Sequence, residues 1–448
     1  MTPVAEARAL RPNPIASVGF VILILYLFLL YGRVLDYAGQ AFRIPAITFV
    51  VLAVLTVFSG ALFRGLGTRI GVLFVALTIL MSLTVPFSLW PRLSLELITQ
   101  DWIRTWVLYF AIVGMALTTR HVVVVLWTVA VALAVHAVLA AVAGGEVDGR
   151  YYGVGRFADP NELGLACLIA SCMILALATY SKHAAATLGY YAFIPVMFLV
   201  MAKTGSRGMF VTALAVGIYL FFRASLKGKV QIAFLAWIVV AIAGLLIPEE
   251  VYKRYSTFET STPEEDTMSA AGSFRSRQYL FERSVEITFR NPLLGTGTGT
   301  FMIADNDAAI EEGRPRGSWH QTHNTFTQIS SENGIPALIL FIAICISFWR
   351  SAGRVKSSCE SIDHPDAKRL QRMVHFYRAA LLALLVGAQF LSIGYSDFFP
   401  VMGGIAVALE RAVAMEIPQW QAVPAAPPPP PRMSRWQMAA RQPVRTGR

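Results

Sequence analysis

Charged side chains are scarce in this chain. Asp, Glu, Lys and Arg make up 15% of its 448 residues, whereas the apolar residues Ala, Val, Ile, Leu, Met, Phe, Trp, Tyr and Cys make up 56%. The apolar residues gather in blocks of about 15–23 residues, the length that crosses the core of a bilayer. Short segments of alternating polarity, the mark of a membrane β-barrel, are absent. The sequence therefore excludes a soluble domain and predicts an all-α, polytopic membrane protein.

Twelve apolar blocks predict about twelve transmembrane helices. They are 15–31, 44–63, 70–89, 102–117, 121–143, 163–179, 187–201, 208–222, 231–247, 334–349, 377–393 and 399–414. We expect four regions: helices 1–9 (1–247), a large loop with amphipathic helices (248–333), helices 10–12 (334–417) and a disordered, Pro-rich basic tail (418–448). The first block lacks a small-residue cleavage site, so we interpret it as a span and not as a signal peptide.

Acidic residues are fewer than basic ones, 27 against 38, which gives a formal net charge of +11. This excess does not predict a nucleic-acid partner. If the N-terminus is cytoplasmic, most Lys and Arg fall on the cytoplasmic side, in agreement with the positive-inside rule. An even number of spans then places both termini in the cytoplasm. The 248–333 loop faces outside, into the periplasm of a Gram-negative cell.

Cysteine is also rare, and its placement excludes a disulfide framework in the outer loop. Cys167, Cys172 and Cys345 fall within predicted spans, and Cys359 falls in a predicted cytoplasmic loop. A P-loop is absent too, because the stretch "GTGTGTF" (295–301) has neither the lysine nor the strand-to-helix setting of that motif. We interpret it as a flexible glycine-rich turn.

The large loop contains one clear helical pattern. Apolar or small residues share one side of a predicted helix, and Glu282, Arg283 and Glu286 lie on its other sides. The residues of that side are Leu280, Phe281, Ser284, Val285 and Ile287. Asn291-Pro292 should end this helix. From Trp319 we expect a second helical segment that leads into the tenth span.

Four polar clusters lie on the same predicted face of the membrane, where polar groups are costly and usually functional. They are 149–164 with Arg156, Asp159 and Asn161; 203–210 with Lys203 and Arg207; 272–284 with Arg275 and Arg277; and 320–340 with His320, His323 and Asn324. Each also has an ordinary interpretation: a turn with an N-cap, a snorkelling arginine, a solvated loop charge and a structural histidine. Because only six residues separate two apolar blocks, Arg207 must lie at the start of the eighth span.

The two histidines of the fourth cluster are three residues apart, so on a helix His320, His323 and Asn324 would share one face. This spacing could form half of a metal site. No cysteine and no HExxH pattern supplies a further ligand, so we expect no metal. A general acid or base is favoured, because imidazole titrates near neutral pH.

Four motifs in order resemble the O-antigen ligase and polymerase superfamily of bacterial envelope glycosyltransferases. They are "GRFADPNELG", "TGSRG", "SRQYLFERSVEITFRNPLLGTGTGTF" and "HNTFTQISSENGIPALI". The resemblance implies transfer of a glycan from undecaprenyl diphosphate to an acceptor hydroxyl, on the outer face of the bacterial inner membrane. Ligases use the lipid A core as acceptor, and polymerases use another lipid-linked glycan. By this resemblance His323, Arg277 and Arg207 are catalytic, and we expect substrate binding by Arg156, Asn161, Asn324, Arg275 and His320.

The chemistry gives these residue types a reason. Arginine carries a permanent charge and a fork of donors that suits phosphate oxygens, so two arginines could stabilise a diphosphate leaving group. We expect no cofactor, since we assign no DxD-like acidic pair of the outer face to metal binding. A single displacement would invert the configuration of the sugar. The alternative is a lipid-linked oligosaccharide flippase, whose arginines would face a cavity open to each side in turn. Polar clusters on one side only favour chemistry there.

Overall fold

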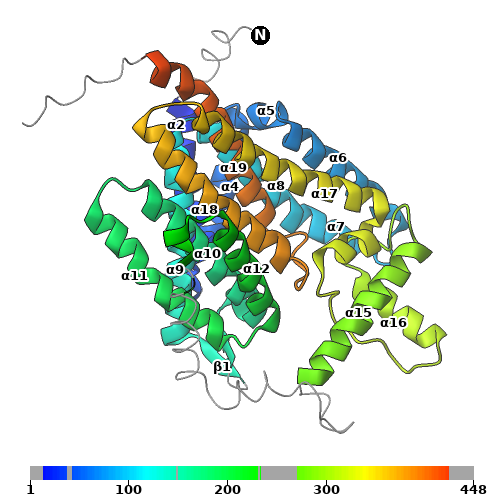
Figure 1. Cartoon of the computed structure of the whole chain (residues 1–448). Helices are drawn as coiled ribbons and strands as arrows, with labels where there is room; N and C mark the ends of the chain where they lie inside the picture. The colour runs from blue at the N-terminus through cyan, green and yellow to red at the C-terminus, as the bar shows by residue number, and fades with distance from the viewer. Residues whose placement is uncertain (1–13, 38–42, 148–149, 231–232, 234–269, 423–448) are drawn as a thin grey trace, which may run out of the picture.

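The computed structural model describes residues 14–37, 43–147, 150–230, 233 and 270–422. These residues form a bundle of helices with one antiparallel hairpin, β1 (Gly145–Val147) and β2 (Arg150–Tyr152) (Figure 1). Seven of the described helices are long and apolar enough to cross a membrane. They are α2 (Pro14–Gly32), α6 (Arg69–Thr84) with its 3-10 extension, α9 (Thr119–Ala143), α10 (Pro160–Tyr180), α11 (Ala184–Lys203), α17 (Thr325–Glu360) and α19 (Phe398–Ala422). The prediction of an all-α, multi-pass membrane protein is confirmed.

Five of the predicted spans are not among these seven helices. The fourth, eighth and eleventh blocks correspond to α8 (Ile103–Met115), α12 (Arg207–Arg223) and α18 (Pro365–Gly387). The second block is divided into α4 (Ile44–Phe58) and α5 (Ala61–Leu66). The break follows from Gly60, whose φ of 75° starts a new helix. The predicted span 231–247 lies outside the described residues apart from residue 233. The count of twelve and the division into four regions therefore stay predictions.

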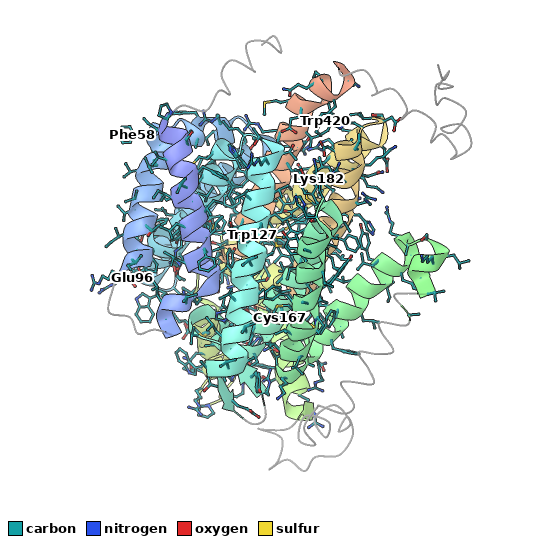
Figure 2. The ribbon with its side chains drawn as sticks, turned by 90° about the vertical axis from the view of Figure 1, so that its left-hand side faces the viewer. Phe58, Glu96, Trp127, Cys167, Lys182 and Trp420 are labelled. Carbon is teal, nitrogen blue, oxygen red and sulfur yellow. The ribbon has the colours of Figure 1, made fainter. Side chains whose placement is uncertain are left out.

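Helix α10 lies inside the bundle and contacts α9, α11 and α18, while α17 packs between α6, α18 and α19. The start of α2 and the end of α19 lie at the top of Figure 1, and the β1–β2 hairpin lies at the bottom. The outward faces carry exposed apolar side chains, as expected of helices that contact lipid. Phe58 and Trp127 in Figure 2 are examples, with 71% and 42% of their surface exposed.

The segment between α18 and α19, residues 388–397, is not helical, so the predicted span 377–393 is wrong at its C-terminal end. The backbone groups of this segment find partners on the start of α17 instead of within a helix. Thr325 Oγ1 donates to the carbonyl of Leu391 over 2.7 Å, and Gln328 Oε1 accepts from the N–H of Gly394 over 3.1 Å. We call residues 388–397 the α18–α19 loop.

Helix α17 bends at Gly334, which has a φ of 82° and a ψ of 172°. The glycine-rich turn packs against this bend. The N–H of Gly297 donates to the carbonyl of Glu332 over 2.8 Å, and the N–H of Gly299 donates to its carboxylate over 2.8 Å. A β-carbon on Gly297 would overlap Ser88. The prediction of a flexible turn is therefore wrong, because the turn is buried and held by hydrogen bonds.

Helix α15 (Ala270–Arg290) ends directly before Asn291-Pro292, as predicted, and is followed by α16 (Phe301–Glu311). Leu280 and Ile287 are buried as expected. The prediction is wrong at two positions: Phe281 is 47% exposed, and Arg283 is 5% exposed. Arg283 can be buried because three carboxylates surround it, those of Glu286, Asp305 and Glu312.

The predicted disordered tail also begins too early, because α19 continues to Ala422 through Pro418. Trp420 stacks on His364, with ring centroids 5.7 Å apart and planes 5° apart. This contact stabilises the last turn of α19. The rest of the predicted tail, 423–448, lies outside the described residues.

Candidate active site

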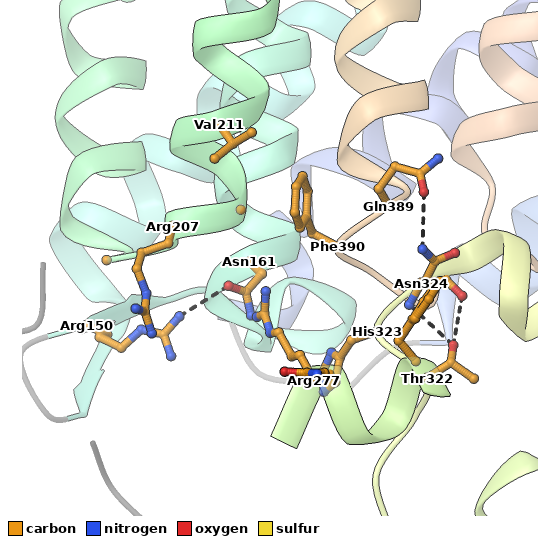
Figure 3. Close-up of a pocket in the computed structure, with 14 residues that line it drawn as sticks. Arg150, Asn161, Arg207, Val211, Arg277, Thr322, His323, Asn324, Gln389 and Phe390 are labelled. Atoms are coloured by element: carbon orange, nitrogen blue, oxygen red, sulfur yellow. Dashed lines mark hydrogen bonds between the residues drawn. The ribbon is translucent and has the colours of Figure 1, made fainter. Parts of the chain in front are cut away.

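Five of the eight predicted site residues line one cavity of about 450 Å³: Arg207, Arg277, His323, Asn161 and Asn324. They come from the starts of α10, α12 and α17 and from α15, with the α18–α19 loop on the remaining side (Figure 3). Residues more than 160 positions apart in the sequence therefore meet at one place. We call this space the arginine cavity.

Arg207 is the first residue of α12, as predicted from the short spacing. A tight turn reverses the chain after α11, with Gly205 at a φ of 59°. Ser206 then caps α12 by accepting a hydrogen bond from the N–H of Met209. The turn and the cap together place the Arg207 side chain at the wall of the cavity.

Arg150 also lines the cavity, and the sequence did not single it out. Its Nε donates to the carbonyl of Thr204 over 2.8 Å, and its Nη2 lies 3.4 Å from Oδ1 of Asn161. The first bond satisfies a carbonyl at the C-terminal end of α11, which has no partner within the helix. Arg150 therefore stabilises the turn that positions Arg207 and adds a third positive charge to the cavity.

Asn161 belongs to the cap of α10. An N-cap in this loop was one expectation, and Asp159 is that residue: its Oδ1 accepts from the backbone N–H of Asn161 over 2.6 Å and from Nδ2 over 2.8 Å. Because Asn161 holds both Asp159 and Arg150, it connects the cap of α10 to the turn before α12. The loop can therefore cap α10 through Asp159 and present Asn161 to the cavity at the same time.

His320 and His323 do not lie on a helix, so the predicted one-face arrangement is wrong. Helix α17 begins at Thr325, because Asn324 is its N-cap and its Oδ1 accepts from the N–H groups of Phe326 and Thr327. Asn324 Nδ2 also donates to Oε1 of Gln389 over 3.1 Å. The asparagine thus fixes the helix start and ties it to the α18–α19 loop.

His323 has a left-handed backbone, with a φ of 52°, one residue before this cap. Its ring is partly buried and lines the cavity, whereas His320 is exposed and does not line it. Burial, followed by the charges of Arg277 and His320, lowers the pKa of His323 to about 4, while Asp159 opposes the shift. The imidazole is therefore neutral at neutral pH and can accept a proton.

Arg277 points into the cavity from α15 (Figure 3). Phe281, one turn later on the same helix, also lines the cavity. This explains the exposure of Phe281: the apolar ring forms the cavity wall and not the buried face of the helix. Arg275 is exposed and does not line the cavity. Arg156 lies in a 3-10 turn, Gly155–Ala158, and its side chain is outside the described residues.

The lining of the arginine cavity has one sign of charge. Its described residues include Arg150, Arg207 and Arg277 and no carboxylate. Arginines in a partly closed space bind phosphate or diphosphate oxygens through charge-assisted hydrogen bonds. Within the described ranges no three His, Cys, Asp or Glu side chains come together as metal ligands, so His320 and His323 are not part of such a group.

Comparison with known proteins agrees with these features. Residues 192–342 match the model of a family described as O-antigen ligase. The match begins within α11 and ends within α17, so it includes Arg207, Arg277 and His323 but not Arg150. No curated protein matches the chain. This domain match, together with the multi-pass helical fold, supports the O-antigen ligase and polymerase superfamily.

Proposed function

We propose that this protein transfers a glycan from undecaprenyl diphosphate to an acceptor hydroxyl, on the periplasmic face of the bacterial inner membrane. The acceptor is the lipid A core in a ligase or another lipid-linked glycan in a polymerase. One observation carries the proposal: three arginines and a neutral histidine line a single cavity that contains no carboxylate among its described residues.

The diphosphate of the donor would bind to the arginines. Arg207 and Arg277 come from opposite sides of the cavity, on α12 and α15, and Arg150 lies beside Arg207 (Figure 3). Negative charge on the diphosphate grows as the glycosidic bond breaks. Fixed cations at that place stabilise the transition state more than the ground state and so accelerate the reaction.

His323 would act on the acceptor. The hydroxyl oxygen attacks the anomeric carbon, the bond from that carbon to the diphosphate oxygen breaks, and the diphosphate leaves with the electron pair. The hydroxyl proton passes to the neutral ring of His323, whose low pKa makes it a weak base. Proton transfer is therefore expected late, after the attacking oxygen has become acidic. Such a single displacement inverts the anomeric configuration and uses no metal ion.

The apolar part of the donor has a path to the cavity along α12. Val211 lines the cavity, and Leu214 and Ile218 follow it at spacings of three and seven residues, on the same face of the helix. All three are about half exposed. A polyprenyl chain can lie along this face while its diphosphate reaches the arginines.

The test is a transfer assay with the purified protein in lipid vesicles and the undecaprenyl-linked glycan of the source bacterium. Arg277→Ala and His323→Ala should each lower turnover by about 100-fold or more, the range for removing a charge stabiliser or a general base. Arg290→Ala is the matched control, because Arg290 is an exposed arginine on the same helix, α15. It should retain wild-type turnover.

Full transfer by either Arg277→Ala or His323→Ala would contradict the assigned role. Translocation of the lipid-linked glycan across the vesicle membrane without any transfer product would favour the flippase alternative. Envelope glycans of a deletion strain separate the two acceptors. Single lipid-linked units indicate a missing polymerase, and intact polymer that is not attached to lipid A core indicates a missing ligase.

A further inference from the structure

A second cavity, of about 360 Å³, is lined by the later residues of the α18–α19 loop and shares no lining residue with the arginine cavity. Its polar lining comes from three separate parts of the chain: Arg33 after α2, Asp101 and Arg104 near the start of α8, and Tyr395 to Asp397 in the α18–α19 loop. None of these residues was predicted to belong to the site.

The backbone around this second cavity departs from regular structure in two places. Arg33 has a left-handed φ of 52°, although it is not a glycine. Asp101 lies in a π-helical turn, Leu97–Trp102, between α7 (Pro91–Glu96) and α8. Both conformations are less stable than the ordinary helix and are concentrated at functional sites. Here both place a charged side chain at the same cavity.

The charges of the second cavity balance, unlike those of the arginine cavity. Two arginines, Arg33 and Arg104, are matched by two carboxylates, Asp101 and Asp397. Arg104 lies 2.8 Å from Asp101, and both side chains are partly exposed, at 34% and 46%. A lining of this kind does not favour an anion. It offers donors and acceptors side by side, the arrangement that recognises the hydroxyls of a neutral sugar.

An unsatisfied hydroxyl supports a ligand at this place. Ser396 is 4% exposed and lines the cavity, and its Oγ is buried without a hydrogen-bond partner among the described residues. A buried hydroxyl without a partner is costly, and such groups are uncommon in folded proteins. Rotation of the Ser396 side chain toward the cavity would bring its Oγ to a hydroxyl of a bound sugar.

The two cavities are joined through one residue. Ser392 lines the second cavity, and its Oγ accepts a hydrogen bond from the backbone N–H of His323 over 2.9 Å. Two and three residues earlier, Phe390 and Gln389 line the arginine cavity. The α18–α19 loop therefore contributes to both cavities and contacts the proposed general base between them.

We propose that the second cavity is a carbohydrate subsite that holds a neutral sugar residue of the acceptor glycan. This inference rests on the proposed function. The sugar that is transferred must lie beside its own diphosphate in the arginine cavity, and a single displacement brings the acceptor from the side opposite the leaving group. A neutral cavity that contacts His323 through Ser392 is placed for that acceptor.

The test measures binding to the purified full-length protein in detergent with two probes. One is inorganic pyrophosphate. The other is the neutral oligosaccharide released by mild acid from the envelope glycan of the source bacterium, followed by saturation-transfer NMR. The double variant Asp101→Asn with Arg104→Gln should bind the oligosaccharide about tenfold more weakly or worse, because hydrogen bonds to charged groups are lost. Its affinity for pyrophosphate should not change.

The matched control is Arg92→Gln with Glu96→Gln, an exposed ion pair of 3.1 Å on α7, one to two turns earlier. This variant should bind both probes as the wild type does. Arg277→Ala should show the reverse of the Asp101 and Arg104 variant, with pyrophosphate binding lost and oligosaccharide binding retained. In transfer assays the Asp101 and Arg104 variant should raise the KM for the acceptor and leave the KM for the donor unchanged.

Two results would overturn the subsite: no oligosaccharide binding by the wild type, or unchanged binding by the Asp101 and Arg104 variant. A raised KM for the donor in place of the acceptor would overturn the assignment to the acceptor. Failure of the proposed function looks different. The wild type would then bind no pyrophosphate, while the loss of oligosaccharide binding in the variant would still identify a carbohydrate site.

Discussion

The backbone N–H of His323 donates a hydrogen bond to Oγ of Ser392 over 2.9 Å. Thr322 Oγ1 lies 3.0 Å from the same oxygen. These contacts hold His323 at a φ of 52°, a conformation that residues other than glycine adopt rarely, although histidine does so more often than most. The ring is therefore positioned by the α18–α19 loop and not by a helix of its own.

The first prediction concerns Ser392. Ser392→Ala removes the acceptor for the His323 N–H, and we expect the kcat of transfer to fall about tenfold, the equivalent of one hydrogen bond. The KM for the donor should stay the same, because Ser392 does not line the arginine cavity. Ser392→Thr keeps the hydroxyl and should restore most of the activity. An unchanged kcat in Ser392→Ala would show that this bond does not position the ring.

The second prediction is a pH profile. Since the pKa of His323 is lowered to about 4, the neutral ring persists down to that pH, and the acid limb of kcat/KM should lie near pH 4. An ordinary histidine would place it near pH 6.5. In the unfolded chain the ring has the ordinary pKa, so this group destabilises the fold progressively as the pH falls from about 6.5 to 4.

Arg277 provides the control for this assignment. Burial is the larger cause of the low pKa, and the Arg277 charge is the next, opposed by Asp159 and assisted by His320. Arg277→Gln removes one cation, so the pKa of His323 should rise and the acid limb of the residual activity should move to higher pH. Rate measurements between pH 3.5 and 8 on both proteins check this. An acid limb at the same pH in both would exclude His323 as the titrating group.

The sequence predicted those parts of the site that depend on local rules. The short spacing between two apolar blocks placed Arg207 at a helix start, and the loop before the sixth span was expected to contain an N-cap, which is Asp159. Asn291-Pro292 ended α15 as expected. Each of these features is decided by residues that are close together in the chain.

Contacts between distant residues could not be predicted in this way. Arg150 acts on the carbonyl of Thr204, 54 residues later. Leu391 and Ile393 were assigned to a span because they are apolar, but hydropathy does not distinguish a membrane helix from a buried loop whose backbone bonds to α17. The second cavity was missed because its charged residues come from three distant segments, with Arg33 in one, Asp101 and Arg104 in another and Asp397 in the third, and these segments meet only in the fold.

The third prediction concerns the bend of α17. Glu332 is fully buried, and its carboxylate accepts from the hydroxyl of Tyr395 over 2.6 Å and from the N–H of Gly299 over 2.8 Å. Glu332→Ala leaves both donors buried without an acceptor, at a cost of about 1–3 kcal/mol for each. We expect a clear drop in the thermal unfolding temperature in detergent, and a smaller one for Glu332→Gln, which keeps one acceptor oxygen.

The control for this prediction is Glu311→Ala, since Glu311 is exposed at 69% and forms a surface ion pair with Arg290. Its unfolding temperature should match that of the wild type within the small effect of a surface ion pair. Equal unfolding temperatures for Glu332→Ala and Glu311→Ala would show that the bend does not depend on this carboxylate.

The fourth prediction concerns Arg283, which holds α15 and with it Arg277. Its guanidinium is buried, donates to Glu286 and Glu312 over 2.7 Å each, and lies 3.6 Å from the fully buried carboxylate of Asp305. Arg283→Met leaves that carboxylate without its cation, and breaking a buried pair in this way costs about 3–5 kcal/mol. Arg290→Met, on the same helix, removes exposed pairs worth about 1 kcal/mol or less. Thermal unfolding in detergent should therefore separate the two variants, and equal stability would mean that α15 is held by its apolar face alone.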